Sequence, residues 1–241
     1  MHEDFINTLK KETPDYGAMF QHLYKEVIAL NKMIGLEDVD HWKLIDSYEK
    51  LLQEEIKEVK EAIEKEDKYN LVKELIDVLV VGGYLYYLQK GHTFDCYNEG
   101  LNGSFSLNED LSIILKEQPH FAALEVAQSS LVKMGCDLEK AINEVLASNI
   151  SKFPTEFEMR KAYWDENLES FSENKPTCQI VKFICSQIED EGRYSGVHCK
   201  TLVDGKGETR YSFWCTHEYG VEKFKYLKSQ SYKDADMREV W

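Results

Sequence analysis

The run LVKELIDVLVVGGYLYYL (residues 71–88) constrains the fold of this chain more than any other stretch. Apolar residues stand at nearly every position, on all sides of a helix, which is typical of the central helix of a bundle. Gly82 and Gly83 would let another helix approach closely, because neither has a Cβ atom. The sequence therefore predicts a mainly α fold with a central helix over about 70–91.

Two carboxylates, Glu74 and Asp77, interrupt this apolar run at a spacing of three, which places them on one helix face. An unpaired buried charge costs several kcal/mol, so the two need a basic partner or a divalent cation. We expect Lys73 to point away from them, which leaves Lys57 or Lys60 on the preceding helix as basic partners. The pattern alone leaves both solutions open.

The preceding segment, predicted as a helix over about 40–65, contains EEIKE at residues 54–58. Glu55 and Glu58 share a face by the same spacing. A solvated surface with Glu–Lys pairs within the helix is the simplest explanation of this segment taken alone. Held against the two carboxylates of the central helix, however, Glu55 and Glu58 would complete an all-oxygen site, which suits Mg²⁺ or Mn²⁺ and not zinc.

The remaining helical and extended segments divide the chain into two predicted domains. Further helices are expected over 19–35, 109–134 and 137–150, with a loop or irregular insertion over 91–110. After Pro154 we expect a short helix or strand over 180–190 and strands over 195–227, with a hairpin turn at DGKG (204–207). The prediction is a helical core over 1–154 with an α+β extension over 155–241.

Charge and cysteine usage exclude several classes of function. The net charge of −15 argues against a nucleic-acid polymer or an anionic membrane as partner, since both require clustered Lys and Arg. No apolar run is long enough for a transmembrane helix, and the N-terminus lacks a signal pattern. The 6 cysteines are scattered, which predicts reduced thiols in a cytoplasmic protein. A zinc cluster from His198, Cys199, Cys215 and His217 competes with a simpler explanation, that the thiols are buried.

The two acidic motifs together resemble the signature of the all-α nucleoside triphosphate pyrophosphohydrolases, the superfamily of MazG-like enzymes and dimeric dUTPases and dCTPases. Glu54-Glu55-x-x-Glu58 matches its EExxE motif, and Glu74-x-x-Asp77 matches the ExxD motif on the next helix. The segments 135–154 (GCDLEKAINEVLASNISKFP) and 219–237 look like those of phage-encoded MazG-like proteins. The chain departs from the compact family pattern by an insertion near 92–120 and by extra residues after Phe153.

The resemblance implies metal-dependent cleavage of a nucleoside triphosphate to the monophosphate and pyrophosphate, with Mg²⁺ or Mn²⁺ as cofactor and a pyrimidine deoxynucleotide such as dCTP or dUTP as substrate. It also implies water activation by Glu54, metal binding by Glu55, Glu58, Glu74 and Asp77, and phosphate binding by Asn149 and Lys152. The aromatic residues upstream of the metal motif, Trp42, His41 and Phe20, are candidates for base binding, and core packing is the alternative explanation for each.

The resemblance further implies a homodimer or homotetramer, and the host cytoplasm as location if the chain is phage-encoded. The apolar surface of the central helix is also more than one small bundle is expected to cover. A non-catalytic, nucleotide-binding regulatory protein of the same fold is the alternative function. A di-iron carboxylate bundle is disfavoured, because its Glu-x-x-His pairs are missing here.

Overall fold

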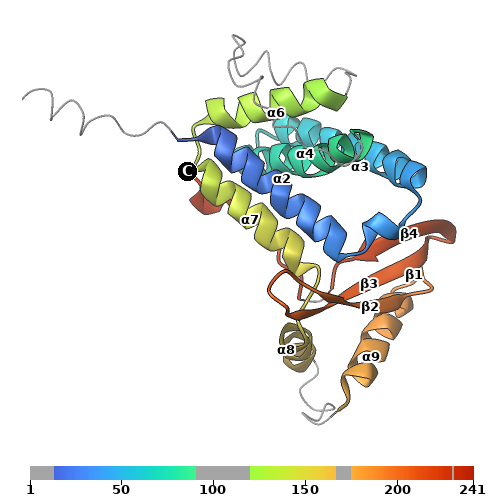
Figure 1. The fold of residues 1–241 in the computed structure, drawn as a ribbon. Helices are drawn as coiled ribbons and strands as arrows, with labels where there is room; N and C mark the ends of the chain where they lie inside the picture. Colours follow the sequence, from blue (N-terminus) through green and yellow to red (C-terminus); the bar gives the residue numbers. More distant parts are fainter. Residues whose placement is uncertain (1–13, 91–119, 167–174, 230) are drawn as a thin grey trace, which may run out of the picture. The chain divides into compact units, whose positions relative to one another are not determined.

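The structure, a computed structural model, describes residues 14–90, 120–166, 175–229 and 231–241. Helices come first along the chain and a small sheet follows them (Figure 1). The helices are α2 (Tyr16–Met33), α3 (His41–Glu64), α4 (Lys68–Gln89), α6 (His120–Met134), α7 (Leu138–Ser151), α8 (Glu156–Glu166) and α9 (Thr177–Asp190), with short 3-10 turns at Leu36–Asp38 and Met237–Glu239. The strands are β1 (Tyr194–Ser195), β2 (His198–Val203), β3 (Thr209–Glu218) and β4 (Val221–Leu227).

The chain forms two compact units. The first contains residues 1–25, 51–142 and 240–241, and the second contains residues 26–50 and 143–239. Each unit is described separately below. The domain boundary at residue 154 stays a prediction.

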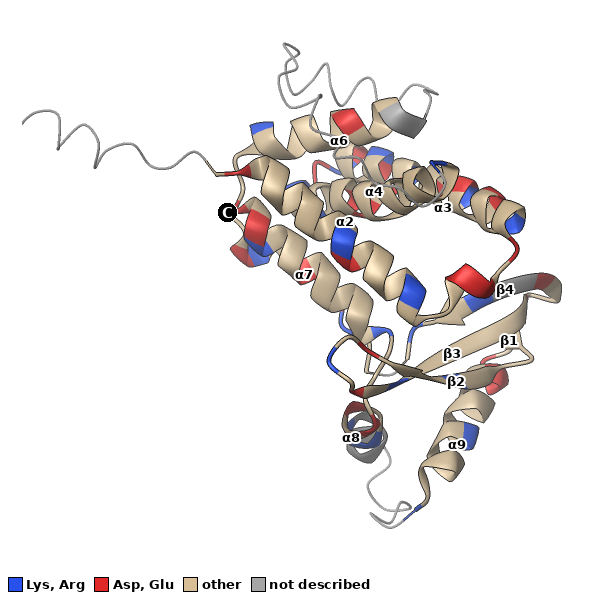
Figure 2. Ribbon diagram, viewed as in Figure 1, with Lys and Arg blue, Asp and Glu red and all other residues tan. Residues whose placement is uncertain are grey.

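In the first unit, α4 and the part of α3 from residue 51 onward form a helical hairpin closed by a short turn. Asp67 caps the start of α4, because its Oδ1 accepts hydrogen bonds from the backbone N–H of Tyr69 (3.2 Å) and Asn70 (3.1 Å). Acidic and basic residues recur along α3 (Figure 2), whereas α4 buries most of its side chains. The hairpin thus combines a charged helix with an apolar one, as the sequence predicts.

The side chains of neighbouring helices pack against the backbone of α4 at its two glycines. A Cβ atom on Gly83 would be 2.5 Å from the ring of Tyr24 in α2, and one on Gly82 would be 2.7 Å from Cδ2 of Leu124 in α6. Tyr24 is itself held, since its hydroxyl accepts a hydrogen bond from Gln128 Nε2 (2.8 Å). The predicted close approach to Gly82 and Gly83 is confirmed.

The second unit contains an antiparallel sheet in which β3 pairs with β1, β2 and β4. The turn at 204–207 joins β2 to β3, and Asp204 Oδ1 accepts from the backbone N–H of Lys206 and Glu208 (both 2.9 Å). Helix α9 packs on one face of the sheet, where Ile180 and Ile184 join Phe213 in a buried cluster. The predicted strands and hairpin are confirmed, and 180–190 is helical.

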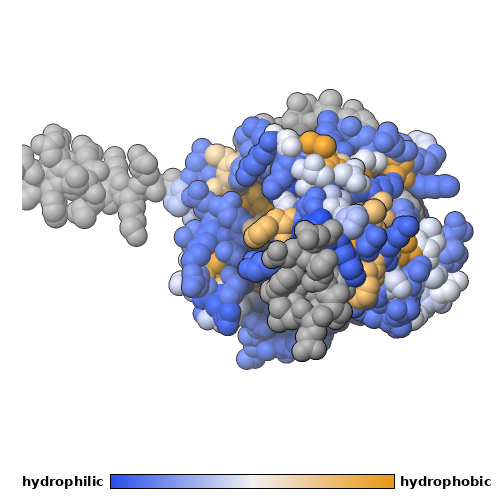
Figure 3. Space-filling view, turned by 90° about the horizontal axis from the view of Figure 1, so that it is seen from below, coloured by the Kyte–Doolittle hydropathy of each residue, from blue (hydrophilic) through white to orange (hydrophobic). Residues whose placement is uncertain are grey.

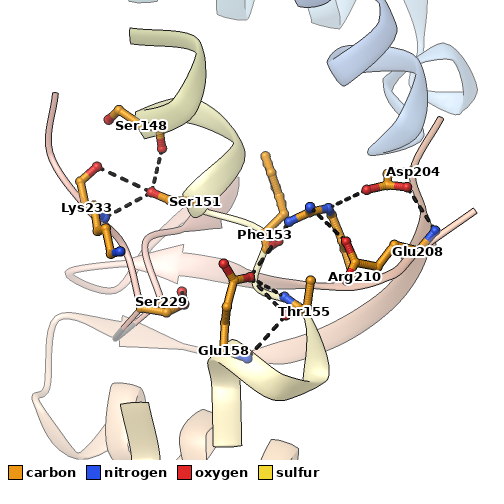
Figure 4. A network of polar contacts seen from close by, with 11 residues as sticks. Ser148, Ser151, Phe153, Thr155, Glu158, Asp204, Glu208, Arg210, Ser229 and Lys233 are labelled. Carbon is orange, nitrogen blue, oxygen red and sulfur yellow. Dashed lines mark hydrogen bonds and ion pairs between the residues drawn. The ribbon is translucent and has the colours of Figure 1, made fainter. Parts of the chain in front are cut away.

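Arg210 of β3 ties this sheet to the segment that follows α7 (Figure 4). Its guanidinium donates to Asp204 Oδ2 (2.8 Å), to the carbonyl oxygen of Phe153 (3.0 Å) and to Glu208 Oε2 (3.3 Å). The Arg210 side chain is only 14% exposed. Since it holds the Asp204 turn and the Phe153 carbonyl at once, Arg210 is a structural anchor of this unit.

The mainly α class with an α+β extension is confirmed. In the described residues no helix combines the length and apolarity needed to span a membrane. Hydrophilic residues predominate on the face seen in Figure 3, with apolar ones scattered among them. Of the described cysteines none is in a disulfide: Cys136, Cys178, Cys185, Cys199 and Cys215 are free thiols. The predicted insertion over 91–110 and the start of the helix predicted from 109 lie outside the described residues.

Candidate functional site

Three of the predicted carboxylates converge on one point between α3 and α4. Glu55 and Glu58 of α3 and Glu74 of α4 each place one carboxylate oxygen within 4.8 Å of the other two. The convergence follows from helix geometry, because a spacing of three puts Glu55 and Glu58 on the face that meets α4 in the antiparallel hairpin. Within the described part of the chain, this is the one cluster of His, Cys, Asp or Glu that could hold a metal ion.

Burial separates this cluster from an ordinary acidic surface. Glu74 is 3% exposed, and its Oε2 atom has no hydrogen-bond partner. An unsatisfied buried carboxylate oxygen is costly, so its presence needs an explanation. Glu55 is half-buried, while Glu58 is exposed, so the cluster opens to solvent on one side.

The electrostatics of the cluster disfavour several negative charges at once. Burial, followed by the charges of Asp77, Glu58 and Glu74, raises the pKa of Glu55 to about 8. Burial is also the main cause that raises the pKa of Glu74 to about 7, although Lys73 opposes it. Both carboxyl groups therefore tend to keep a proton near neutral pH unless a cation is close. A divalent cation supplies that charge, and oxygen-only donors are those that Mg²⁺ and Mn²⁺ prefer, so these residues fit such an ion.

The expectation that Lys73 points away from the acidic residues is wrong. Its Nζ atom lies 3.0 Å from Glu74 Oε1 and 3.3 Å from Asp77 Oδ2. The spacing of four places Lys73 beside Asp77 on the helix, and the long side chain also reaches the adjacent Glu74. Asp77 is thus close to the cluster, and its charge acts on Glu55, but it does not join the converging trio.

A cavity of about 260 Å³ lies beside the cluster, and Glu58 and Glu74 of the trio line it. Glu54 also lines this cavity, and its predicted role in orienting a water molecule stays a prediction. The other lining residues are Lys57, Glu61 and Asn70. Sequence reasoning missed Asn70, although its place one turn before Glu74 on the same helix face could have indicated it.

The predicted phosphate-binding residues, Asn149 and Lys152, lie near the end of α7 in the second unit. Lys152 Nζ donates to Asn149 Oδ1 (2.6 Å), and the amide of Asn149 is buried. The structure brings these two residues together as a pair. Their role toward phosphate stays a prediction.

The three predicted base-binding side chains differ sharply in exposure. Trp42 is 75% exposed and makes an edge contact with the ring of His41, at 5.4 Å between centroids. Phe20 is 3% exposed and therefore offers no free face to a base. Exposure favours Trp42 over Phe20 as a stacking surface, and the assignment stays a prediction.

The four residues considered for zinc do not gather. Cys215 is buried in the apolar cluster under α9, whereas the ring of His217 contacts Thr216 Oγ1 through Nδ1 (2.9 Å). His198 and Cys199 are consecutive in β2, so their side chains point to opposite faces of the sheet. The buried-thiol explanation holds for Cys215.

The fold and the site define a helical protein with an acidic, metal-type centre between two antiparallel helices. Residues 45–96 match the family model of the MazG nucleotide pyrophosphohydrolase domain. The match contains both acidic motifs and identifies the α3–α4 segment as MazG-like, which supports nucleotide pyrophosphohydrolase activity in general. No curated protein and no solved structure matches the chain. Asn149 and Lys152 lie outside the matched residues.

Proposed function

We propose that this chain is a metal-dependent nucleoside triphosphate pyrophosphohydrolase that releases pyrophosphate and a nucleoside monophosphate. The observation that carries the proposal is the convergence of Glu55, Glu58 and Glu74, together with a buried Glu74 carboxylate oxygen that has no hydrogen-bond partner. The MazG-like match over the same helices supports the reaction class.

The residues of the trio, with Asp77 as a fourth candidate, would hold Mg²⁺ or Mn²⁺. When bound, such an ion supplies positive charge for the triphosphate and acidifies water. Glu54 lies at the cavity wall and is proposed to orient the attacking water and accept its proton. The low exposure of Glu74 keeps its carboxylate fixed in position, which favours precise placement of the reacting groups.

The finer points of the proposal rest on the resemblance. Asn149 and Lys152 are proposed to bind phosphate oxygens, and Trp42, with His41 beside it, is proposed to stack on the base. A pyrimidine deoxynucleotide such as dCTP or dUTP is the proposed substrate. Phe20 is a less suitable base contact, because it is buried.

Self-association as a homodimer or homotetramer also rests on the resemblance. The sequence also suggests self-association because α4 is apolar on all sides. The structure does not support this reason, since 13 residues of α4 are already buried within the single chain. The particle mass in solution, measured by light scattering with and without Mg²⁺, decides between a monomer and these assemblies.

The test is a panel of all common dNTPs and NTPs with Mg²⁺, scored for pyrophosphate and for monophosphate. We expect release that stops in excess EDTA and that falls by at least about 100-fold in Glu55→Gln. Glu64→Gln is the matched control, because Glu64 is an exposed carboxylate on the same helix outside the cavity. Nucleotide binding without pyrophosphate release from any substrate contradicts the proposal and identifies a binding protein.

A further inference from the structure

Lys73 occupies an unusual place for a lysine in an apolar helix. Its side chain is 19% exposed, and its ammonium group lies between Glu74 Oε1 (3.0 Å) and Asp77 Oδ2 (3.3 Å). The other lysine near the cluster, Lys57, is 75% exposed and pairs with Glu61 Oε1 at 3.5 Å. Of these two cations, only Lys73 is bonded to residues proposed as metal ligands.

The two oxygen atoms of Glu74 have different surroundings. Oε1 accepts from Lys73, whereas Oε2 is buried and has no hydrogen-bond partner. Glu74 also belongs to the converging trio with Glu55 and Glu58. The Glu74 carboxylate therefore both accepts from the Lys73 ammonium group and belongs to the acidic cluster.

An ammonium group and a divalent cation bind the same donors, namely carboxylate oxygens, and they repel each other at short range. Without a nearby cation, Glu74 and Asp77 would be two partly buried negative charges on one helix face, beside Glu55. Lys73 compensates these charges. A divalent cation that uses Asp77, or both oxygens of Glu74, must displace the ammonium group.

We propose that Lys73 is an internal cation that competes with the divalent metal ion for Glu74 and Asp77, stabilising the metal-free fold and weakening metal binding. This inference rests on the proposed function only in taking the trio as a metal site. Two consequences are independent of catalysis: loss of Lys73 lowers the stability of the metal-free protein, and it raises the affinity for the metal ion.

The experiment compares the wild type with Lys73→Met and Lys57→Met by Mn²⁺ titration calorimetry without nucleotide, and by thermal unfolding in EDTA. Lys57→Met is the matched control, because Lys57 also lines the cavity, and its loss removes the same charge from the same helical hairpin without breaking an ion pair to a proposed ligand. We expect Lys73→Met to bind Mn²⁺ about tenfold more tightly than the wild type and Lys57→Met to change affinity by less than about twofold. In EDTA, Lys73→Met should unfold at a lower temperature than Lys57→Met.

Two further variants keep the test decisive. Lys73→Arg retains the charge and should bind Mn²⁺ like the wild type. If Lys73→Met folds only after Mn²⁺ is added, the proposal is supported. If it does not fold at all, Lys73→Gln replaces it, since the amide can still donate to Glu74.

Equal or weaker Mn²⁺ binding in Lys73→Met relative to Lys57→Met overturns the proposal. Its failure is distinct from that of the proposed function, because the titration contains no nucleotide. Tighter binding without pyrophosphate release leaves the inference standing and rejects the enzyme. Pyrophosphate release with an unchanged affinity rejects the inference and leaves the enzyme.

Discussion

Asp77 on α4 acts on Glu55 across the α3–α4 hairpin: after burial, the Asp77 charge is the largest cause that raises the pKa of Glu55 to about 8. Asp77 also forms an ion pair with Lys73, with 3.3 Å between Asp77 Oδ2 and Lys73 Nζ. The two carboxylates therefore differ in their need for a cation. The negative charge of Asp77 is compensated by its ion pair with Lys73. Glu55, in contrast, has three acidic neighbours that raise its pKa, and the opposing effect of Lys73 on that pKa is the smallest of the contributions.

The raised pKa values predict that the metal-free protein loses stability as the pH rises from about 4.5 to about 8. Over this range the folded chain holds protons on Glu55 and Glu74 that the unfolded chain has released, so deprotonation favours unfolding. The expected loss in the free energy of unfolding is on the order of several kcal/mol. Urea unfolding in EDTA at several pH values measures it.

Two comparisons assign this pH dependence to the site. Glu55→Gln should flatten the curve, because the amide does not titrate, whereas Glu64→Gln should leave it unchanged. Saturating Mg²⁺ should restore stability at pH 8, since an ion that binds the folded state stabilises it. A metal-free protein that becomes more stable between pH 5 and 8 contradicts the pKa assignment.

Neutralising Glu55 and neutralising Asp77 should change the stability of the metal-free protein differently. Glu55→Gln relieves repulsion and should stabilise it by about 1–2 kcal/mol at pH 8. Asp77→Asn removes a charge that Lys73 already compensates, so it should give no gain or a loss. Chemical unfolding of both variants in EDTA at pH 8 measures the difference. A gain in Asp77→Asn equal to that in Glu55→Gln would show that the Lys73 ion pair contributes nothing.

Much of this site follows from helix periodicity. The spacing of three in both acidic motifs predicts that their carboxylates converge, and the structure brings Glu55, Glu58 and Glu74 together, because each motif lies on a regular helix. The same rule, applied at a spacing of four, would have found the contact between Lys73 and Asp77. The sequence analysis instead expects Lys73 to point away from the acidic residues, whereas Glu74 and Asp77 of its own helix hold it.

Helix α8 was also missed, although its start carries a recognisable signal. Thr155 and Glu158 form a capping box: the backbone N–H of Thr155 donates to Glu158 Oε2 (2.8 Å), and that of Glu158 donates to Thr155 Oγ1 (3.2 Å). Figure 4 shows this pair beside Arg210. The helix has no clear apolar stripe, so periodicity alone could not identify it. The burial of Phe20 agrees with the helical spacing of apolar residues in α2, where Leu23 and Val27 are buried as well.

The contacts around the glycines of α4 predict unequal effects of adding a methyl group. In Gly83→Ala the new Cβ would meet the ring of Tyr24 at 2.5 Å, and that ring is buried and hydrogen-bonded. We expect a loss of about 1–3 kcal/mol in the free energy of unfolding. Urea unfolding measures it.

Gly82→Ala is the matched comparison, because its new Cβ meets the end of the Leu124 side chain most closely, at 2.7 Å, and then Leu124 Cγ (3.3 Å) and Leu52 Cδ1 (3.4 Å). The Leu124 side chain can turn away, and alanine gains roughly 1 kcal/mol in helix propensity over glycine. Gly82→Ala should therefore lie close to the wild type in stability. Equal losses in both variants would mean that the Tyr24 ring yields as readily as Leu124.

The last prediction concerns the pair at the end of α7. If Lys152 binds the triphosphate, Lys152→Ala should raise KM by about tenfold or more and leave the melting temperature within a few degrees of the wild type, because a half-buried lysine at a helix end contributes little to the fold. Steady-state kinetics with the best nucleotide of the substrate panel measures KM and kcat separately. Lys161→Ala, which changes an exposed lysine on α8, is the control for loss of positive charge alone.

Asn149→Ala should raise KM as well, since Asn149 Oδ1 accepts from Lys152 Nζ (2.6 Å) and fixes the direction of the ammonium group. An unchanged KM in both variants would assign the pair to the internal structure of the second unit, and the phosphates would then have to be bound by other residues.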